Sequence, residues 1–221
     1  MTPWKTIESV PTAEGALELR QRGPKDFLIV IGGRVLMTSR ERRSEEAVAA
    51  KACRPIADRA RPRVLIGGLG MAYTVRAALD ALPPHAEVVV AELTQTVETW
   101  CRGPLAVLTD DALADPRVSM VIGDVAKVID EALRGSFDAI ILDLYEGPNA
   151  QTQAGDDPFY GKHALVRSRL ALTEGGILSV WAEELDAQFA RRFASCGFTV
   201  EIDKLGSSRT HVVYVGTRRA G

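Results

Sequence analysis

The sequence has few of the residues that would indicate a protein held together by disulfides or zinc, or one inserted in a membrane. Only three of its 221 residues are cysteines, and none of them has CxxC spacing. This argues against a disulfide framework and a structural zinc site, so we expect Cys53, Cys101 and Cys196 to be small core residues. No apolar run reaches the ~20 residues of a membrane-spanning helix, and the first residues contain no apolar signal-peptide core. We therefore expect a cytoplasmic protein without a membrane partner.

An excess of positive charge is also lacking. The chain has 27 lysines and arginines against 29 aspartates and glutamates, a formal net charge of −2. No bulk positive field would attract nucleic acid, so no nucleic-acid partner is expected. Repeats and low-complexity linkers are absent from the sequence, and 46% of its residues are hydrophobic. We predict an N-terminal β-hairpin and helix extension over residues 1–60 and a nucleotide-binding catalytic domain over residues 61–221.

The predicted extension contains one clear hairpin signal. Two short apolar runs, at residues 27–31 and 34–38, flank a Gly-Gly pair, which is typical of a β-hairpin. Residues 44–58 are rich in alanine and begin with acids, so they are predicted to form a helix. The hairpin has an edge with which a second copy of the chain could pair, so a homodimer is compatible with the sequence.

From residue 63 onward, short apolar segments alternate with helical ones. Strands are predicted at residues 64–66, 87–91, 118–122, 137–142 and 176–181, and helices at residues 72–82, 94–101, 125–133, 158–170 and 183–195. Strands that are apolar on both faces and separated by helices indicate a parallel sheet covered on both sides. The last two strands, at 198–202 and 211–215, are too closely spaced for a helical crossover, so the last strand should be antiparallel. This α/β pattern is the outline of the Rossmann-like class I methyltransferase sheet.

Three successive strand ends carry residues suited to a nucleoside. The first strand runs into a glycine-rich turn, which permits a sharp bend and close approach of a ligand. Glu92 ends the second strand, where a carboxylate can accept hydrogen bonds from both ribose hydroxyls. Asp124 follows the third strand and could accept from the adenine amine, or instead cap the next helix. The glycines of this predicted site are Gly67, Gly68, Gly70 and Gly123.

Two rival nucleotide sites fit less well. A dinucleotide motif, G-x-G-x-x-G/A, would place the bulky Tyr73 at its last position. A P-loop is excluded because no GK[ST] follows the glycines, and the strand ends carry no phosphate-binding lysine or arginine. A nucleoside without phosphates fits better, which describes an S-adenosylmethionine-type donor.

Seven segments, in this order, carry a family resemblance: IGGLGMA at 66–72, VAEL at 90–93, DPRV at 115–118, GD at 123–124, FDAIILD at 137–143, FY at 159–160 and LTEGGIL at 172–178. From about residue 26 to residue 216 the chain resembles the spermidine synthase, or polyamine aminopropyltransferase, branch of the class I S-adenosylmethionine-dependent methyltransferase superfamily. The resemblance implies a sulfonium donor, either S-adenosylmethionine or its decarboxylated form. It also implies a small-molecule acceptor, such as an amine, and no metal.

The resemblance also assigns the acceptor side. In the family the fourth strand continues as D-x-x-D, whose first acid assists deprotonation of the attacking amine and whose second holds the diamine. Here the sequence reads DLYE, so the implied catalytic residues are Asp143 and Glu146, with Tyr145 between them as a cavity wall; Asp143 could also anchor the donor. The chain departs from the family at residues 44–46, which replace a Tyr-His-Glu segment, and at Gly70, which replaces an acid.

The last departure bears on the choice of donor. An acid at position 70 would repel the carboxylate of S-adenosylmethionine, whereas Gly70 removes that repulsion and leaves backbone N–H groups to bind it. This argument favours methyl transfer to a small molecule. The resemblance favours the alternative, aminopropyl transfer from decarboxylated S-adenosylmethionine to a di- or polyamine. A non-catalytic nucleotide-binding protein is the third hypothesis.

Overall fold

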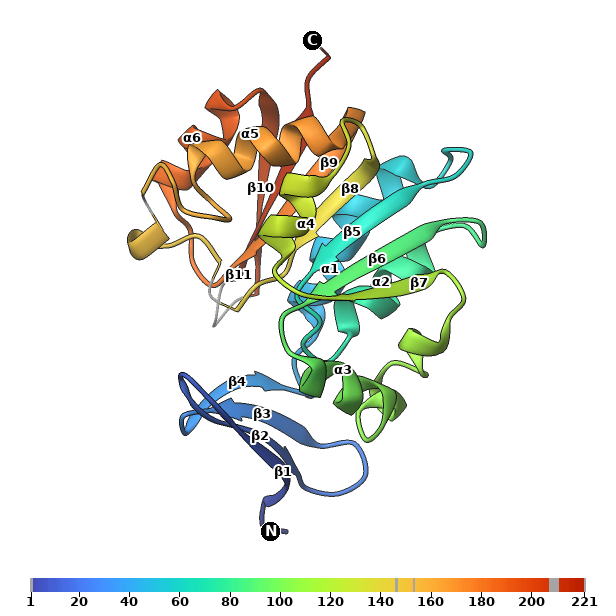
Figure 1. The fold of residues 1–221 in the computed structure, drawn as a ribbon, viewed down its shortest axis with the longest axis vertical. Helices are drawn as coiled ribbons and strands as arrows, with labels where there is room; N and C mark the ends of the chain where they lie inside the picture. Colours follow the sequence, from blue (N-terminus) through green and yellow to red (C-terminus); the bar gives the residue numbers. More distant parts are fainter. Residues whose placement is uncertain (1, 146, 153, 207–210, 221) are drawn as a thin grey trace.

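The computed structural model describes residues 2–145, 147–152, 154–206 and 211–220. Figure 1 shows a small sheet at the N-terminal end of the chain and a larger sheet above it, with helix α3 (Gln95–Arg102) lying against the small sheet. None of the helices in the described ranges combines the length and the apolar character needed to span a membrane.

The N-terminal sheet is antiparallel, with its strands in the order β1-β2-β3-β4. The predicted hairpin is confirmed as β3 (Phe27–Ile31) and β4 (Arg34–Thr38). Two further strands, β1 (Lys5–Thr12) and β2 (Gly15–Gln21), were not predicted. Strand β1 is an edge strand that is exposed along almost its whole length, so it lacks the apolar alternation that would reveal a half-buried strand.

The larger sheet has the order β10-β11-β9-β8-β5-β6-β7. Strands β5 to β9 are parallel, and β11 runs antiparallel to both of its neighbours, β9 and β10. This confirms the predicted Rossmann-like α/β class with its antiparallel last strand, and β10 and β11 form an antiparallel pair at the edge, with β10 outermost. Of the connection between the last two strands, residues 207–210 lie outside the described part of the chain. The strands are β5 (Arg63–Gly67), β6 (Glu87–Glu92), β7 (Val118–Ile122), β8 (Phe137–Leu142), β9 (Leu172–Ala182), β10 (Phe198–Leu205) and β11 (His211–Arg218).

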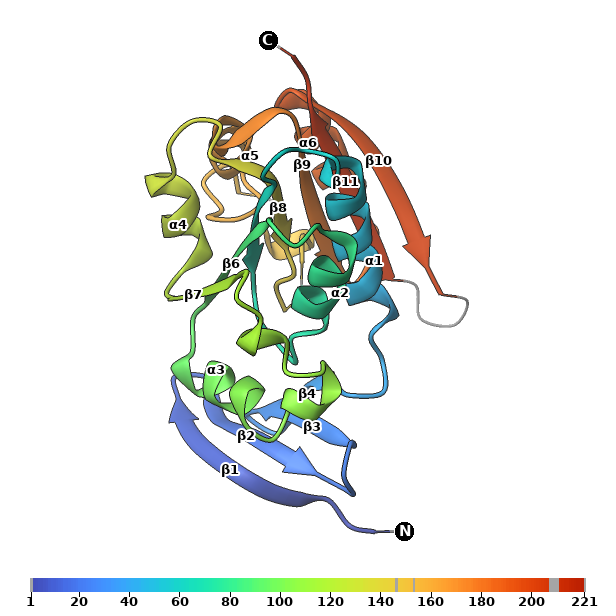
Figure 2. The same ribbon diagram turned by 90° about the vertical axis from the view of Figure 1, so that its right-hand side faces the viewer.

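Helices cover both faces of this sheet (Figure 2). The side chains of β5 explain why: Val64 and Ile66 are buried in the core shared with α1 and α2, while Leu65 is buried in the core shared with α4, α5 and α6. Strands buried on both faces are therefore continuously apolar. The helices are α1 (Arg43–Cys53), α2 (Tyr73–Ala81), α4 (Val125–Glu131), α5 (Lys162–Ala171) and α6 (Ala187–Ser195), with 3₁₀ turns at Arg54–Ile56, Ala106–Leu108, Ala112–Ala114 and Ala150–Thr152.

Several predicted boundaries shift by a few residues. Helix α1 begins one residue before Ser44, whose hydroxyl donates to Glu45. Helix α6 begins four residues later than predicted because Asp186 caps it, accepting hydrogen bonds from two backbone N–H groups. The division of the chain at residue 60 stays a prediction; α1, on its N-terminal side, packs against β9 and β11 of the larger sheet.

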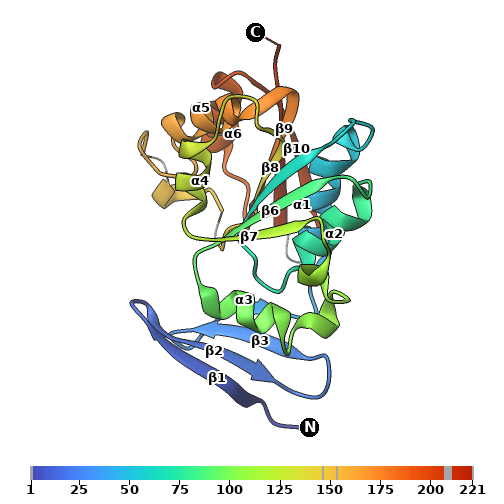
Figure 3. The ribbon, with the colours of Figure 1, turned by 45° about the vertical axis from the view of Figure 1, so that its right-hand side comes forward.

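Two hydrogen bonds fix the N-terminal sheet over the carboxyl ends of the parallel strands. The indole Nε1 of the fully buried Trp100, on α3, donates to Glu8 Oε2 at 2.7 Å. The Tyr73 hydroxyl, at the start of α2, donates to the Ser39 carbonyl at 2.9 Å. Figure 3 shows α3 lying along the N-terminal sheet. The small sheet thus forms a roof over the strand ends at which the sequence predicts a site.

Candidate active site

A cavity of about 590 Å³ lies between the N-terminal sheet and the carboxyl ends of β5, β6, β7 and β8. Ligands of open α/β sheets bind at this edge of the sheet, and the volume is that of a small-molecule site. The roof of the cavity comes from the N-terminal sheet: Thr12, Ala13, Glu14, Leu17, Ile29, Ile31, Leu36 and Met37. The floor carries the predicted residues Gly68, Gly70, Glu92, Gly123, Asp124, Asp143 and Tyr145.

The glycine-rich turn has a conformation that side chains would obstruct. Gly68 has φ +90°, and a Cβ there would run into the backbone carbonyl of Asp143. A Cβ on Gly67 would lie 2.8 Å from a methyl group of Val125, so this glycine permits close packing of α4 and does not itself line the cavity. Gly70 has φ +52°, and its Cβ would lie 2.9 Å from the Met37 sulfur. Met37 therefore occupies the space next to the position where the resemblance placed an acid.

Glu92 is held in place by both of its carboxylate oxygens. Oε2 accepts from the Leu69 N–H at 3.0 Å, and Oε1 accepts from the Thr94 N–H at 2.9 Å. Burial raises the pKa of this carboxyl group, and the backbone donors oppose the rise. A carboxylate has about four acceptor positions, so these bonds leave acceptor capacity for a ligand. Its fixed orientation suits a pair of neighbouring hydroxyls, such as those of ribose.

Asp124 caps a helix and also borders the cavity. Its Oδ1 accepts from the Ala126 N–H at 2.8 Å and caps α4, and the residue also lines the cavity beside Gly123. Capping uses Oδ1 alone. A contact between the other carboxylate oxygen and an adenine amine stays a prediction.

Asp143 directly follows β8 and is hydrogen-bonded to the glycine-rich turn and to α2. Its N–H donates to the Gly67 carbonyl at 2.9 Å, and its carboxylate accepts a hydrogen bond from the Thr74 hydroxyl. Burial raises the pKa of Asp143 to about 7; the negative charge of Glu45 adds to the rise, and the bond from Thr74 opposes it. A carboxyl group with this pKa can take up a proton near neutral pH, as a general base must.

The rest of the predicted acceptor group is only partly described. The ring of Tyr145 is 43% exposed, lines the cavity and lies 4.7 Å from the Arg34 guanidinium carbon of β4. Glu146 lies outside the described residues, so its catalytic role stays a prediction. Trp181, on β9, also lines the cavity.

Two acidic residues in the cavity wall were missed by the site prediction. Glu45 lies in the first turn of α1, within the segment that departs from the family, and that departure was its only signal. Glu14 lies in the turn between β1 and β2. It could not be found without those two strands.

All the charged side chains that line the described cavity are acidic: Glu14, Glu45, Glu92, Asp124 and Asp143. Such a cavity favours a cationic ligand and disfavours an anionic one. Several backbone donors of the glycine-rich turn are already bonded within the protein. The Gly68 N–H donates to the Ala91 carbonyl at 2.9 Å, the Leu69 N–H donates to Glu92, and the Ala72 N–H donates to the Leu69 carbonyl at 2.7 Å. The expectation that this turn offers its N–H groups to a ligand carboxylate therefore fails at these three positions.

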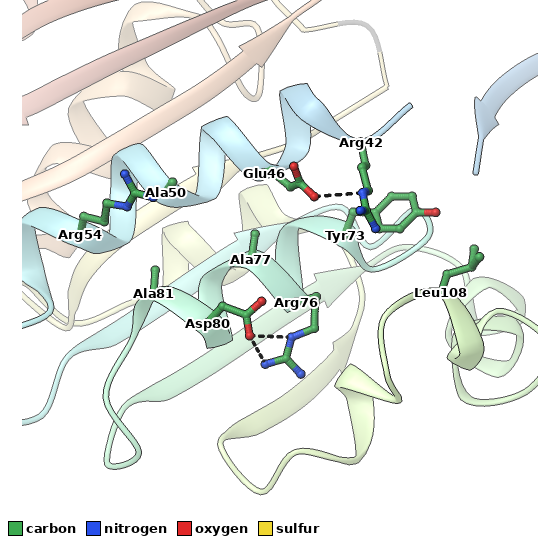
Figure 4. A pocket seen from close by; sticks show the side chains of 10 residues that line it. All are labelled: Arg42, Glu46, Ala50, Arg54, Tyr73, Arg76, Ala77, Asp80, Ala81 and Leu108. Carbon is green, nitrogen blue, oxygen red and sulfur yellow. Dashed lines mark hydrogen bonds and ion pairs between the residues drawn. The ribbon is translucent and has the colours of Figure 1, made fainter. Parts of the chain in front are cut away.

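A second cavity, of about 270 Å³, lies between α1 and α2 and contains none of the predicted site residues (Figure 4). Its charges are largely paired, because Arg42 contacts Glu46 at 3.1 Å and Arg76 contacts Asp80 at 2.6 Å. We assign it no role in the site.

The DPRV segment has a structural role. Arg117 pairs with Asp115 at 2.8 Å and also donates to the Leu79 and Leu82 carbonyls at the end of α2. The guanidinium group lowers the pKa of Asp115 to about 2. This network ties β7 to α2, and neither side chain lines the cavity.

No group of three or more histidine, cysteine, aspartate or glutamate side chains is placed to hold a metal ion in the part of the chain that the structure describes. The three cysteines are buried with free thiols.

Comparisons with known proteins agree with this geometry. The spermine/spermidine synthase domain profile matches residues 19–205. A polyamine aminopropyltransferase from Clostridium tetani is 31% identical over 121 residues, which are 55% of this chain and 41% of that protein. The chain thus aligns with less than half the length of this curated relative.

Solved structures show the same fold. Spermidine synthase from Thermotoga maritima superposes with a TM-score of 0.74 at 20% identity, over 96% of this chain and 72% of that one. A probable spermidine synthase from Corynebacterium glutamicum gives a TM-score of 0.68 at 18% identity, over 96% and 79% of the two chains.

Proposed function

The chain belongs to the spermine/spermidine synthase domain family, and from this premise we propose that it transfers an aminopropyl group from decarboxylated S-adenosylmethionine to an amine of a di- or polyamine. The proposal replaces methyl transfer, which the comparisons do not support.

The observation that carries the proposal is the absence of lysine and arginine from the described cavity wall, which holds five carboxylates. Decarboxylated S-adenosylmethionine and a polyamine are both cations. S-adenosylmethionine adds a carboxylate, whose repulsion by one nearby acid costs about 1–4 kcal/mol at short range. The same wall also disfavours a nucleotide with phosphates.

Each residue has a defined part in the proposed reaction. Glu92 accepts from the ribose hydroxyls, and Gly123 and Asp124 border the base. Asp143 takes the proton of the attacking ammonium, and the nitrogen lone pair then forms a bond to the propyl carbon next to sulfur. The carbon–sulfur bond breaks, its electrons stay on sulfur, and 5′-methylthioadenosine leaves as a neutral thioether. The N-terminal roof limits access of water to the reacting pair.

Product analysis tests this function. The protein is incubated with 1,4-diaminobutane and either decarboxylated or ordinary S-adenosylmethionine, and the products are identified by mass spectrometry. We expect 5′-methylthioadenosine and an aminopropylated amine from the decarboxylated donor only. S-adenosylhomocysteine and a methylated amine would support methyl transfer, and no product with either donor would support a binding protein.

A further inference from the structure

Glu45 and Asp143 reach the same cavity from different parts of the fold. Glu45 lies in the first turn of α1, and Asp143 follows β8. We infer that Glu45 is a binding residue for the acceptor, holding the ammonium form of the reacting amine beside Asp143. This inference rests on the proposed function and adds to it a residue outside the segments that carry the family resemblance.

Glu45 forms no ion pair among the described residues, and the one protein charge that attracts its carboxylate is that of His211. Its carboxylate accepts a hydrogen bond from the Ser44 hydroxyl at 2.6 Å. Burial raises the pKa of Glu45. A partly buried carboxylate without a paired cation weakens the fold unless something else compensates it, which a bound cation would do.

Glu46, the next residue, differs from Glu45 in its ion pairing and in the cavity that it lines. Glu46 is 49% exposed in its side chain and pairs with Arg42 at 3.1 Å, facing the groove between α1 and α2 that Figure 4 shows. Two successive glutamates on one helix turn thus face different cavities, and only Glu45 faces the one that holds the predicted site residues.

The effect of Glu45 on Asp143 points to a shared ligand. The charge of Glu45 contributes to the raised pKa of Asp143, so the two carboxylates repel each other when no cation is present. The other titratable groups coupled to Glu45 are Glu41 and His211, and Glu45 also raises the pKa of Tyr73. An ammonium ion bound between Glu45 and Asp143 would relieve the repulsion and satisfy both groups.

The test compares Glu45→Gln with the matched control Glu46→Gln. The probe is 1,4-diaminobutane, titrated by calorimetry into protein saturated with 5′-methylthioadenosine, which cannot react. We expect Glu45→Gln to weaken diamine binding about tenfold or more, because a charge-assisted contact is lost. Glu46→Gln should bind the diamine as the unmodified protein does, and nucleoside affinity should be unchanged in both variants.

Two results would overturn the inference: diamine binding that is unchanged in Glu45→Gln, or no diamine binding by the unmodified protein. Folding should not obscure the result, because Glu45→Gln removes a repelling charge and should melt at or above the temperature of the unmodified protein. Turnover separates this inference from the proposed function. A protein that transfers aminopropyl groups with an unchanged KM for the diamine in Glu45→Gln keeps the function and loses the inference. A protein that binds the diamine through Glu45 but transfers no aminopropyl group keeps the inference and loses the proposed function.

Discussion

Asp143→Asn is expected to lower kcat by about 10²-fold or more, because loss of a positioned general base costs rates of this order. Asparagine keeps the size of the side chain but cannot accept the proton of the attacking amine. The kcat/KM of the unmodified protein should fall below about pH 7, where the carboxyl group of Asp143 titrates in the free enzyme, and the variant should lack this acidic limb. Steady-state rates across pH, with 1,4-diaminobutane and the decarboxylated donor, measure both effects.

A surface acid provides the control. Asp130→Asn, on α4, removes a charge that pairs with Arg167 at 2.6 Å outside the cavity, and it should leave kcat unchanged. Near-full turnover by Asp143→Asn would remove Asp143 from the chemistry.

The same carboxyl group should make stability depend on pH. Because folding raises the pKa of Asp143 from 3.8 to about 7, the contribution of this group to stability is complete below about pH 4 and is lost as pH rises through 7. Asparagine cannot ionise, so Asp143→Asn should lose less stability than the unmodified protein between about pH 5 and pH 8. Thermal melts of both proteins at about pH 5 and about pH 8 check the direction of this pH dependence. An equal fall in melting temperature in the two proteins would contradict the pKa assigned to Asp143.

Glu92→Ala is expected to weaken binding of 5′-methylthioadenosine at least tenfold, because each charge-assisted hydrogen bond to a ribose hydroxyl is worth about 1.5–3 kcal/mol. Part of the lost affinity will come from disturbance of the glycine-rich turn, because Glu92 also accepts a hydrogen bond from the Leu69 N–H. A nucleoside without the 3′-hydroxyl separates the two causes, since the variant should discriminate less between the deoxy and normal forms than the unmodified protein does.

The control for Glu92 lies at the other end of the same strand. Glu87→Ala, on β6, removes a carboxylate that pairs with Arg61 at 2.7 Å and Arg63 at 3.3 Å, away from the cavity. It should leave nucleoside affinity unchanged. Equal discrimination by Glu92→Ala and the unmodified protein would show that Glu92 does not contact ribose.

The residues at the strand ends could be predicted because a parallel sheet brings its carboxyl ends to one edge. Glu92 ends β6, Asp124 comes shortly after β7 and Asp143 directly follows β8, and the fold then fixes which side of the sheet they reach. The sequence revealed the β3–β4 hairpin of the roof but not its other two strands, β1 and β2. Strand β1 is largely exposed, so its residues carry no periodic signal, and Glu14 in the following turn was missed with it.

The sequence argument for S-adenosylmethionine as the donor rested on one position, Gly70. Gly70, taken alone, suggests room for a ligand carboxylate. The structure places Met37 of β4 beside it, and the wall of the cavity carries carboxylates from distant parts of the chain, including Glu45. The charge of a cavity depends on every element that lines it, so long-range packing decides it rather than one motif.

The most direct test of the central claim is a calorimetric comparison of the two donors with the unmodified protein at one ionic strength. A cavity whose charged walls are all acidic should bind decarboxylated S-adenosylmethionine at least about fivefold more tightly than S-adenosylmethionine, since a carboxylate near these acids costs about 1–4 kcal/mol. Equal affinities, or tighter binding of S-adenosylmethionine, would contradict the aminopropyl-transfer account.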